Sequence, residues 1–214
     1  MKIPLSKKLR KRAHIELAML QDEVMEVFYS LRTGPEPVLH GGTAIWRCYD
    51  GVRFSEDLDF YGEVPDGFDK ALGTALASRG LELVKYKAAP NVIFAKISNG
   101  TATVKLEVTR RKPPERVLKS YVRTDGGSMD IYTLSPEELM KEKMAAYLGR
   151  RYIRDIYDIY HLSGHTERRD IEGIRDFLAN IPAPVDEKNL RALIYTGIAP
   201  SFREIVDALR RRFG

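Results

Sequence analysis

Cysteine is almost absent from the sequence, with Cys48 the single one among 214 residues. An intrachain disulfide is therefore excluded, and the composition favours a reducing compartment. No apolar run approaches the roughly 18 residues that span a bilayer. The start of the chain is basic but has no apolar stretch after the basic residues, so it lacks the pattern of a signal peptide. We expect a cytoplasmic protein with no membrane partner.

Amide side chains are also scarce, with one glutamine and four asparagines, whereas charged residues make up 30% of the chain. Hydrophobic residues make up 43%, which supports a folded core and excludes wholesale disorder. The net charge is +5, and basic residues cluster at 7–12, 110–112, 150–151 and 210–212. Such clusters suit a polyanion such as a nucleic acid or a triphosphate, although solvated helix faces have the same composition.

The first part of the chain alternates between helix-like and strand-like patterns. Apolar residues at helical spacing predict a helix over 6–31 that breaks at 33–37, and shorter helices over 43–49 and 66–79. Strand composition with period-two alternation predicts strands at 38–40, 57–62, 81–87, 91–98 and 102–109. Residues 113–127 begin with prolines and end with glycines, and we expect them to be less regular.

The last part is predicted to be helical throughout. Ser135, Pro136 and Glu138 have the pattern of a capped helix start, and a second capping pattern begins at Ser201. The segment "RDIYDIYHL" continues as helix, and further helices are expected over 168–180, 186–196 and 201–213. We therefore expect an α+β protein with a sheet-containing domain over 1–130 and a helical domain over 131–214.

Two aspartates share one face of the second predicted strand. Residues i and i+2 of a strand point the same way, so Asp57 and Asp59 are expected side by side. Two carboxylates this close repel each other unless a cation or a proton intervenes, and Mg²⁺ is commonly bound by such a pair together with substrate phosphates. Glu107, on the polar face of the last predicted strand, is the candidate third carboxylate for a two-metal site. A solvent-facing strand edge has the same Asp-x-Asp pattern.

A glycine pair, Gly41 and Gly42, follows the strand at 38–40 and precedes a predicted helix. This arrangement leaves backbone N–H groups uncovered, and the positive end of the helix attracts phosphate. Glycine is equally suited to a plain turn that requires a positive φ. The glycine pair and Asp-x-Asp within one unit are more specific than either part alone.

The stretch "HGGTAIW…RFSEDLDF" resembles the signature of the polymerase-β-like nucleotidyltransferase superfamily, with an apolar residue, two glycines, a gap and Asp-apolar-Asp. More narrowly, "GGTA", "R-x-S-x-D-L-D-F" and the later "K…RR…RDIYDIYHL" are similar to the AbiEii/AbiGii toxin family of nucleotidyltransferases, which includes MenT-like toxins. The resemblance extends from about residue 36 to residue 164. The gap between Gly42 and Asp57 is slightly longer than is usual in the superfamily. The implied fold is a mixed sheet with flanking helices, followed by a C-terminal helical domain.

The resemblance implies roles for the matching residues. Nucleotide binding is implied for Gly41, Gly42, Thr43, Ser55 and Lys143. Metal binding, to Mg²⁺ or to Mn²⁺ in its place, is implied for Asp57, Asp59 and Glu107. The implied catalytic set is Asp57, Asp59, Glu107, Lys143 and Asp155. Asp155 would orient Lys143 or the acceptor. A structural ion pair with Arg151 or Arg154 is the alternative for Asp155, and Asp158 is equally suited to such a pair.

The implied reaction is the transfer of a nucleoside monophosphate from an NTP to an acceptor hydroxyl, with release of pyrophosphate. The acceptor implied by the family is the 3′ end of an RNA, with tRNA as the first candidate. An antitoxin protein is an implied partner. Three alternatives stay open, because a fold does not fix a function. They are a protein hydroxyl as acceptor, a module that binds NTP, RNA or an antitoxin without catalysis, and a housekeeping transferase outside any toxin system.

Overall fold

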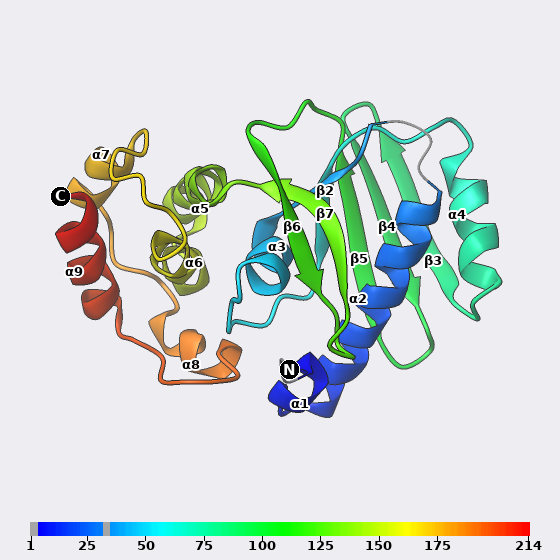
Figure 1. The fold of residues 1–214 in the computed structure, drawn as a ribbon, viewed down its shortest axis with the longest axis horizontal. Helices are drawn as coiled ribbons and strands as arrows, with labels where there is room; N and C mark the ends of the chain where they lie inside the picture. Colours follow the sequence, from blue (N-terminus) through cyan, green and yellow to red (C-terminus); the bar gives the residue numbers. More distant parts are fainter. Residues whose placement is uncertain (1–3, 32–34) are drawn as a thin grey trace.

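The computed structural model describes residues 4–31 and 35–214. Its N-terminal part is built on a seven-stranded mixed sheet with the strand order β3-β4-β5-β2-β1-β7-β6 (Figure 1). Strand β1 pairs antiparallel with β2 and parallel with β7, and β2 pairs parallel with β5. The five strands expected from the sequence are all present. The strands are β1 (Val38–His40), β2 (Leu58–Tyr61), β3 (Glu82–Ala89), β4 (Val92–Ser98), β5 (Thr103–Thr109), β6 (Arg116–Val122) and β7 (Ser128–Leu134).

The alternation in the sequence decides which side chains of β5 enter the core. Val104, Leu106 and Val108 are fully buried. Lys105 and Glu107, between them, are exposed on the other face. A one-residue shift would move the whole apolar row into solvent, so the row fixes the register of β5 against β2 and with it the direction of Glu107.

Strand β6 corrects the expectation that residues 113–127 are irregular. Most side chains of β6 are exposed, and Tyr121 is its buried residue. The sequence of β6 therefore lacks the apolar alternation by which a half-buried strand is recognised. It is a strand because it pairs antiparallel with β7, which in turn pairs with β1. The sheet continues in β7 to Leu134, past residue 130.

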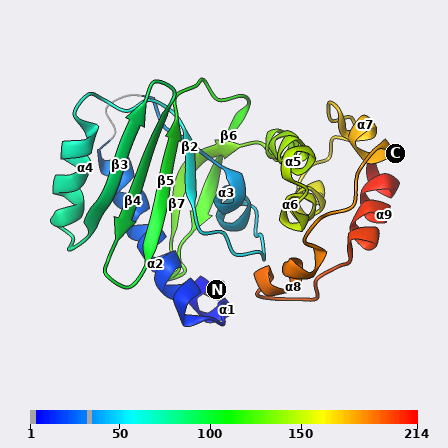
Figure 2. The same cartoon turned by 180° about the vertical axis from the view of Figure 1, so that it is seen from behind.

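Helices pack against the sheet (Figures 1 and 2). Helix α2 (Arg12–Ser30) contacts β5 and α4 (Phe68–Ala77), and its Phe28 ring lies 4.7 Å from the Phe60 ring of β2. Helix α3 (Gly41–Cys48), which begins two residues before the expected helix, joins the same buried cluster through Ala44 and Ile45.

The helix expected over 6–31 is in fact two helices, α1 (Leu5–Lys8) and α2. They are separated because Leu9 is extended, with ψ of 134°. This turn lets Leu5 and Leu9 pack in a small cluster with Trp46 and Phe54. The break expected at 33–37 lies partly outside the described residues.

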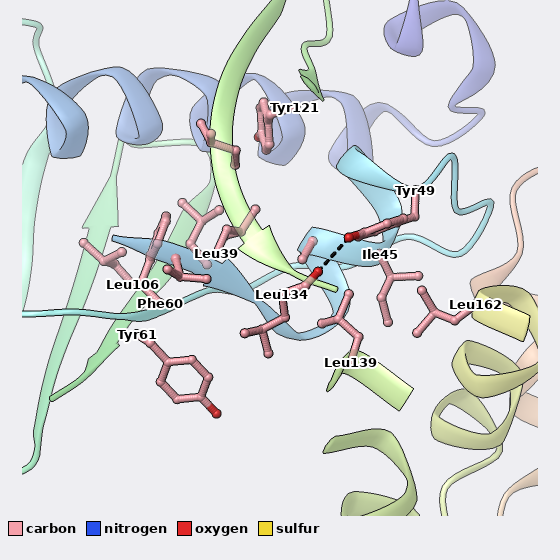
Figure 3. Packing of buried hydrophobic residues seen from close by; sticks show 14 of the residues in the cluster. Leu39, Ile45, Tyr49, Phe60, Tyr61, Leu106, Tyr121, Leu134, Leu139 and Leu162 are labelled. Atoms are coloured by element: carbon pink, nitrogen blue, oxygen red, sulfur yellow. Dashed lines mark hydrogen bonds between the residues drawn. The ribbon is translucent and has the colours of Figure 1, made fainter. Parts of the chain in front are cut away.

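The main core holds the central strands under α3. Figure 3 shows Leu39, Phe60 and Leu106, one from each of β1, β2 and β5, close together in this core. At the end of α3, the Tyr49 hydroxyl donates a hydrogen bond of 2.6 Å to the carbonyl oxygen of Leu134. The bond ties the C-terminal end of α3 to the end of β7.

The chain after β7 is helical and lies at one end of the sheet (Figure 1). Ser135 accepts a hydrogen bond from the Glu138 N–H group, and Ser201 and Glu204 form a complete capping box, so both predicted helix starts are confirmed. The helices inside 168–180 and 186–196 are shorter than expected. None of the helices in the described ranges is both long and apolar enough to traverse a bilayer. The elements are α5 (Pro136–Arg150), α6 (Ile153–Ser163), α7 (Ile174–Ala179), a 3-10 helix η1 (Glu187–Asn189), α8 (Leu190–Leu193) and α9 (Phe202–Phe213).

Candidate active site

Three carboxylates predicted from the sequence lie on neighbouring strands. Asp59 on β2 is directly opposite Glu107 on β5 in the parallel pair. Asp57 directly precedes β2, and its side chain, like that of Asp59, is half-buried. Leu58 and Phe60 are fully buried on the opposite face. The strand alternation therefore directs Asp59 and Glu107 away from this buried face, and Asp57 and Asp59 lie beside the N-terminus of α3.

The electrostatics of Asp59 favour a bound cation. Burial raises the pKa of Asp59 and repulsion from Asp57 and Glu107 raises it further, while His40 and Lys143 lower it. A cation would relieve the repulsion among the carboxylates. Among the described residues, no three or more His, Cys, Asp and Glu side chains are gathered closely enough to hold a metal by themselves. Two carboxylates are nevertheless what Mg²⁺ uses when water and substrate phosphates complete its shell, so the residues fit this ion.

The glycine pair forms the first turn of α3 and lies against the carboxylates. Gly41 has a φ of 72°, and a Cβ atom on it would lie 2.6 Å from Oδ2 of Asp59. A Cβ atom on Gly42 would lie 2.5 Å from Oγ of Ser55 and 2.7 Å from a terminal nitrogen of Arg53. Only glycine leaves the N-terminus of α3 open at this place, where its free N–H groups can donate to phosphate.

Thr43 has its side chain away from this opening. The hydroxyl donates a hydrogen bond to the main-chain carbonyl of Asp57, and the side chain is fully buried. The bond ties the first turn of α3 to the residue before β2. The long gap between Gly42 and Asp57 is taken up by α3 and by a loop that carries Arg53 and Ser55. The hydroxyl of Thr43 is therefore occupied, and the group that Thr43 can offer to a phosphate is its backbone N–H.

We expect Gly42→Ala to lower kcat/KM for the nucleotide by about a hundredfold, because the new methyl group displaces Ser55 and Arg53 and narrows the phosphate position. Steady-state kinetics with varied NTP measures the effect. The control is Gly73→Ala inside α4, where the added carbon meets Leu83 at an ordinary 3.8 Å. If both variants keep the wild-type kcat/KM, phosphate does not bind at this helix end.

A pocket of about 220 Å³ opens over these residues. Its lining includes these residues predicted from the sequence: Gly41, Gly42, Ser55, Asp57, Asp59 and Lys143. Its basic side chains are Arg53, Lys143, Arg150 and Arg154. Three predicted residues do not line it: the buried Thr43 and Asp155, and Glu107, which stands beside Asp59 on β5. The pocket combines carboxylates suited to a metal with groups suited to phosphate.

A buried ion-pair network positions Lys143. Its Nζ atom lies 2.8 Å from Oδ2 of Asp158 and 3.6 Å from Oδ1 of Asp155. Both oxygens of Asp158 accept hydrogen bonds from Arg53, at 2.8 and 2.7 Å. Both oxygens of Asp155 accept hydrogen bonds of 2.7 Å from Arg150. Asp155 therefore lies where it can orient Lys143.

The partners of Asp158 differ from the expected ones. It pairs with Arg53 and Lys143, and not with Arg151 or Arg154. Burial raises the pKa of Asp158, but the two cations more than offset this and lower it to about 2. The ionised carboxylate thus links α6 to α5 and to the loop before β2.

His40 and Glu142 line the pocket but were not among the predicted site residues. His40 is opposite Asp59 in the β1–β2 pair. Its Nδ1 atom lies 3.1 Å from Oε2 of Glu142, and its ring stacks on Tyr61 with centroids 3.9 Å apart. In the sequence, His40 is the last residue of the strand expected at 38–40. The pairing with a glutamate far along the chain depends on the tertiary fold, which local patterns do not show.

Arg154 is a further pocket residue that the sequence analysis did not assign to the site. Its Nε atom is buried and has no hydrogen-bond acceptor among the described residues. Its guanidinium carbon lies 5.3 Å from the centre of the Tyr152 ring. A buried polar atom without a partner is costly, so this side chain is suited to an anionic ligand.

Comparison with known proteins gives a family and a fold. The sequence profile of the family described as "Nucleotidyl transferase AbiEii toxin, Type IV TA system" matches residues 32–212. No significant match is found among curated protein sequences.

Two solved structures from Helicobacter pylori share the fold. The protein JHP933 is 20% identical with a TM-score of 0.61, over 91% of this chain and 89% of its own. A protein provisionally assigned as a nucleotidyltransferase is 21% identical with a TM-score of 0.62, over 91% of this chain and 92% of its own. The α+β fold with a mixed sheet and a C-terminal helical part is therefore one found in nucleotidyltransferase-like proteins. Because the family profile covers most of the sequence, the chain belongs to the AbiEii nucleotidyltransferase toxin family.

Proposed function

We propose that the protein transfers a nucleoside monophosphate from an NTP to a hydroxyl at the 3′ end of an RNA and releases pyrophosphate. The first candidate for this RNA is tRNA. One observation carries this proposal: Asp57 and Asp59 lie in the same pocket as the open N-terminus of α3 and Lys143. Carboxylates for a metal next to donors for phosphate are the two requirements of metal-assisted chemistry at phosphorus.

The donor triphosphate is expected over the first turn of α3. The free N–H groups at Gly42 and Thr43 would donate to its β- and γ-phosphates. Lys143 and Arg154, both in the pocket lining, would bind the same phosphates from the helical part. Ser55, whose Oγ atom lies close to Gly42, would add a hydroxyl donor.

Asp57 and Asp59 would hold Mg²⁺, or Mn²⁺ in its place. When bound, the ion would offset negative charge that develops on the phosphoryl group in transfer. Glu107 lies opposite Asp59 in the sheet, where it would orient the acceptor hydroxyl and accept its proton. Asp155 would act through Lys143, as a positioning residue.

We expect Lys143→Ala to reduce kcat/KM for the NTP by about a hundredfold, because a positive charge aimed at the phosphates is lost. The matched control is Lys141→Ala on the same helix. Lys141 pairs with Glu138 and Glu172 and does not line the pocket. Steady-state kinetics that find the same loss in both variants, or in neither, would place the triphosphate elsewhere.

An RNA acceptor is favoured by the net charge of +5 and by two arginines that line the pocket, Arg150 and Arg154. The family's toxin description supports the further proposal that the chain acts in the cytoplasm with a cognate antitoxin protein. A protein hydroxyl would use the same donor site, so it is the second candidate acceptor.

The acceptor is tested by incubating the protein with Mg²⁺ and each NTP in turn, labelled at the α-phosphate, together with total RNA and cell protein. We expect label that ribonuclease removes and that marks RNA of tRNA size. Label that resists ribonuclease and is removed by protease would show that the acceptor is a protein hydroxyl and not an RNA. Binding of NTP without any label would indicate a module that does not catalyse.

A further inference from the structure

A second cavity, of about 480 Å³, lies at the ends of β2 and β5, beside the candidate active site. Tyr61 and Gly62 form one wall, and residues 111–116 form another. The cavity is large enough for a nucleotide-sized ligand. None of the roles derived above uses it.

The strands lead from the carboxylates to this cavity. Tyr61 is two residues after Asp59 on β2, so both side chains project from the same face. On β5, Thr109 is two residues after Glu107 and lies opposite Tyr61. An extended ligand that leaves the cavity along β2 and β5 would therefore reach Asp59 and Glu107.

Tyr61 is a rigid partition between the two sites. Its hydroxyl donates a hydrogen bond to Glu142, and its ring stacks on His40 with planes 4° apart. Both partners line the active-site pocket, whereas Tyr61 lines the second cavity. On the cavity side the guanidinium of Arg111 lies 4.6 Å from the centre of the Tyr61 ring.

The segment 111–116 supplies cations that no carboxylate of a described residue neutralises. Arg111, Lys112 and Arg116 are exposed, and none of them is in an ion pair with a described residue. The Arg116 guanidinium lies 4.5 Å from the centre of the Tyr132 ring. Two carboxylates, Glu36 and Glu63, also line the cavity. Positive charge is therefore concentrated on the 111–116 segment.

The same segment supplies apolar surface. Pro113 and Pro114 are half-buried and line the cavity between the cations. Flat apolar surface next to guanidinium groups suits a stacked nucleobase, and the cations suit the phosphates on either side of it. A base can enter such a cavity only from a single-stranded end, where it is not stacked in a duplex.

We infer that this cavity binds the terminal nucleotides of a single-stranded RNA acceptor and directs the 3′ hydroxyl to Asp59 and Glu107. The inference rests on the proposed function and adds to it an acceptor site separate from the donor site. Arg111 and Arg116 contact the RNA phosphates, and the proline pair packs against a base.

The test is the double variant Arg111→Gln, Arg116→Gln, which removes two charges and keeps polar side chains. The control is Lys87→Gln, an exposed lysine on the edge strand β3. Fluorescence anisotropy of a short 5′-fluorescein-labelled RNA, single-stranded or blunt-ended duplex, measures binding. Transfer kinetics give the KM for RNA and the KM for the NTP separately.

We expect the double variant to bind the single strand about tenfold more weakly. The slope of log K against the logarithm of the salt concentration should become shallower by about 0.7 for each lost phosphate contact. The KM for RNA rises by the same factor and the KM for the NTP does not change. If wild type labels RNA and the double variant has the same KM for RNA, the cavity assignment is wrong and the proposed function stands. If wild type neither binds nor labels RNA, the cavity assignment and the proposed RNA acceptor are both wrong.

Discussion

We expect Asp59→Asn to reduce nucleotidyl transfer by at least about a thousandfold while the protein stays folded. The change keeps the size of the side chain and removes the charge that faces the pocket. Because burial and repulsion from Asp57 and Glu107 raise the pKa of Asp59, the native carboxylate is held in an unfavourable environment. The variant should therefore be as stable as wild type, or slightly more stable.

Two measurements separate these effects. Single-turnover assays give the transfer rate, and chemical denaturation gives the free energy of unfolding. Asp66→Asn, at an exposed position, is the control and should change neither. A folded Asp59→Asn protein with wild-type activity would falsify the assignment of this carboxylate to the reaction.

The largest expected effect on stability is that of Asp158→Asn, about 3–5 kcal/mol. The substitution leaves the charges of Arg53 and Lys143 without their shared carboxylate, and the side chains of Arg53, Lys143 and Asp158 are all at most 9% exposed. An uncompensated buried charge costs more free energy than the intact pair gains. Urea denaturation at neutral pH measures the difference from wild type.

The exposed ion pair between Arg203 and Asp207 on α9 provides the matched control, since its atoms are 3.8 Å apart and its arginine is 91% exposed. Asp207→Asn should cost less than about 1 kcal/mol. An equally small effect of Asp158→Asn would show that the buried network does not hold the two halves together.

The pH dependence gives an independent check on Asp158. In the folded protein its pKa is lowered to about 2, and in an unfolded chain an aspartate has a pKa of about 3.9. The stabilisation is therefore fully present above about pH 4 and is lost as the pH falls towards 2. The difference in unfolding free energy between wild type and Asp158→Asn should shrink over the same interval.

The site residues that sequence reasoning found are those that local patterns mark. Asp57 and Asp59 alternate with buried residues around β2, and Glu107 alternates in the same way on β5. Gly41 and Gly42 stand between a strand and a helix, and the structure shows that a methyl group at either would meet the site. These positions are readable because strand periodicity fixes the direction of a side chain. Their chemical roles stay predictions that the variants above test.

Other parts of the fold depend on contacts between residues distant in the sequence. The strand β6 is exposed on most of its length and exists because β7 pairs with it. Arg53 enters the site because Asp158, more than 100 residues later, accepts hydrogen bonds from two of its side-chain nitrogens. His40 meets Glu142 across a similar separation. No local periodicity encodes such pairs, so sequence alone did not place these residues.

The most direct test of the account is to follow the two ends of the triphosphate separately. The purified protein is incubated with Mg²⁺, an RNA acceptor and one NTP, labelled either at the α-phosphate or at the γ-phosphate. The account predicts that α-label is incorporated into RNA, that γ-label leaves as pyrophosphate, and that Asp57→Ala abolishes both. Incorporation of γ-label, or incorporation of α-label that survives Asp57→Ala, would contradict nucleotidyl transfer at this site.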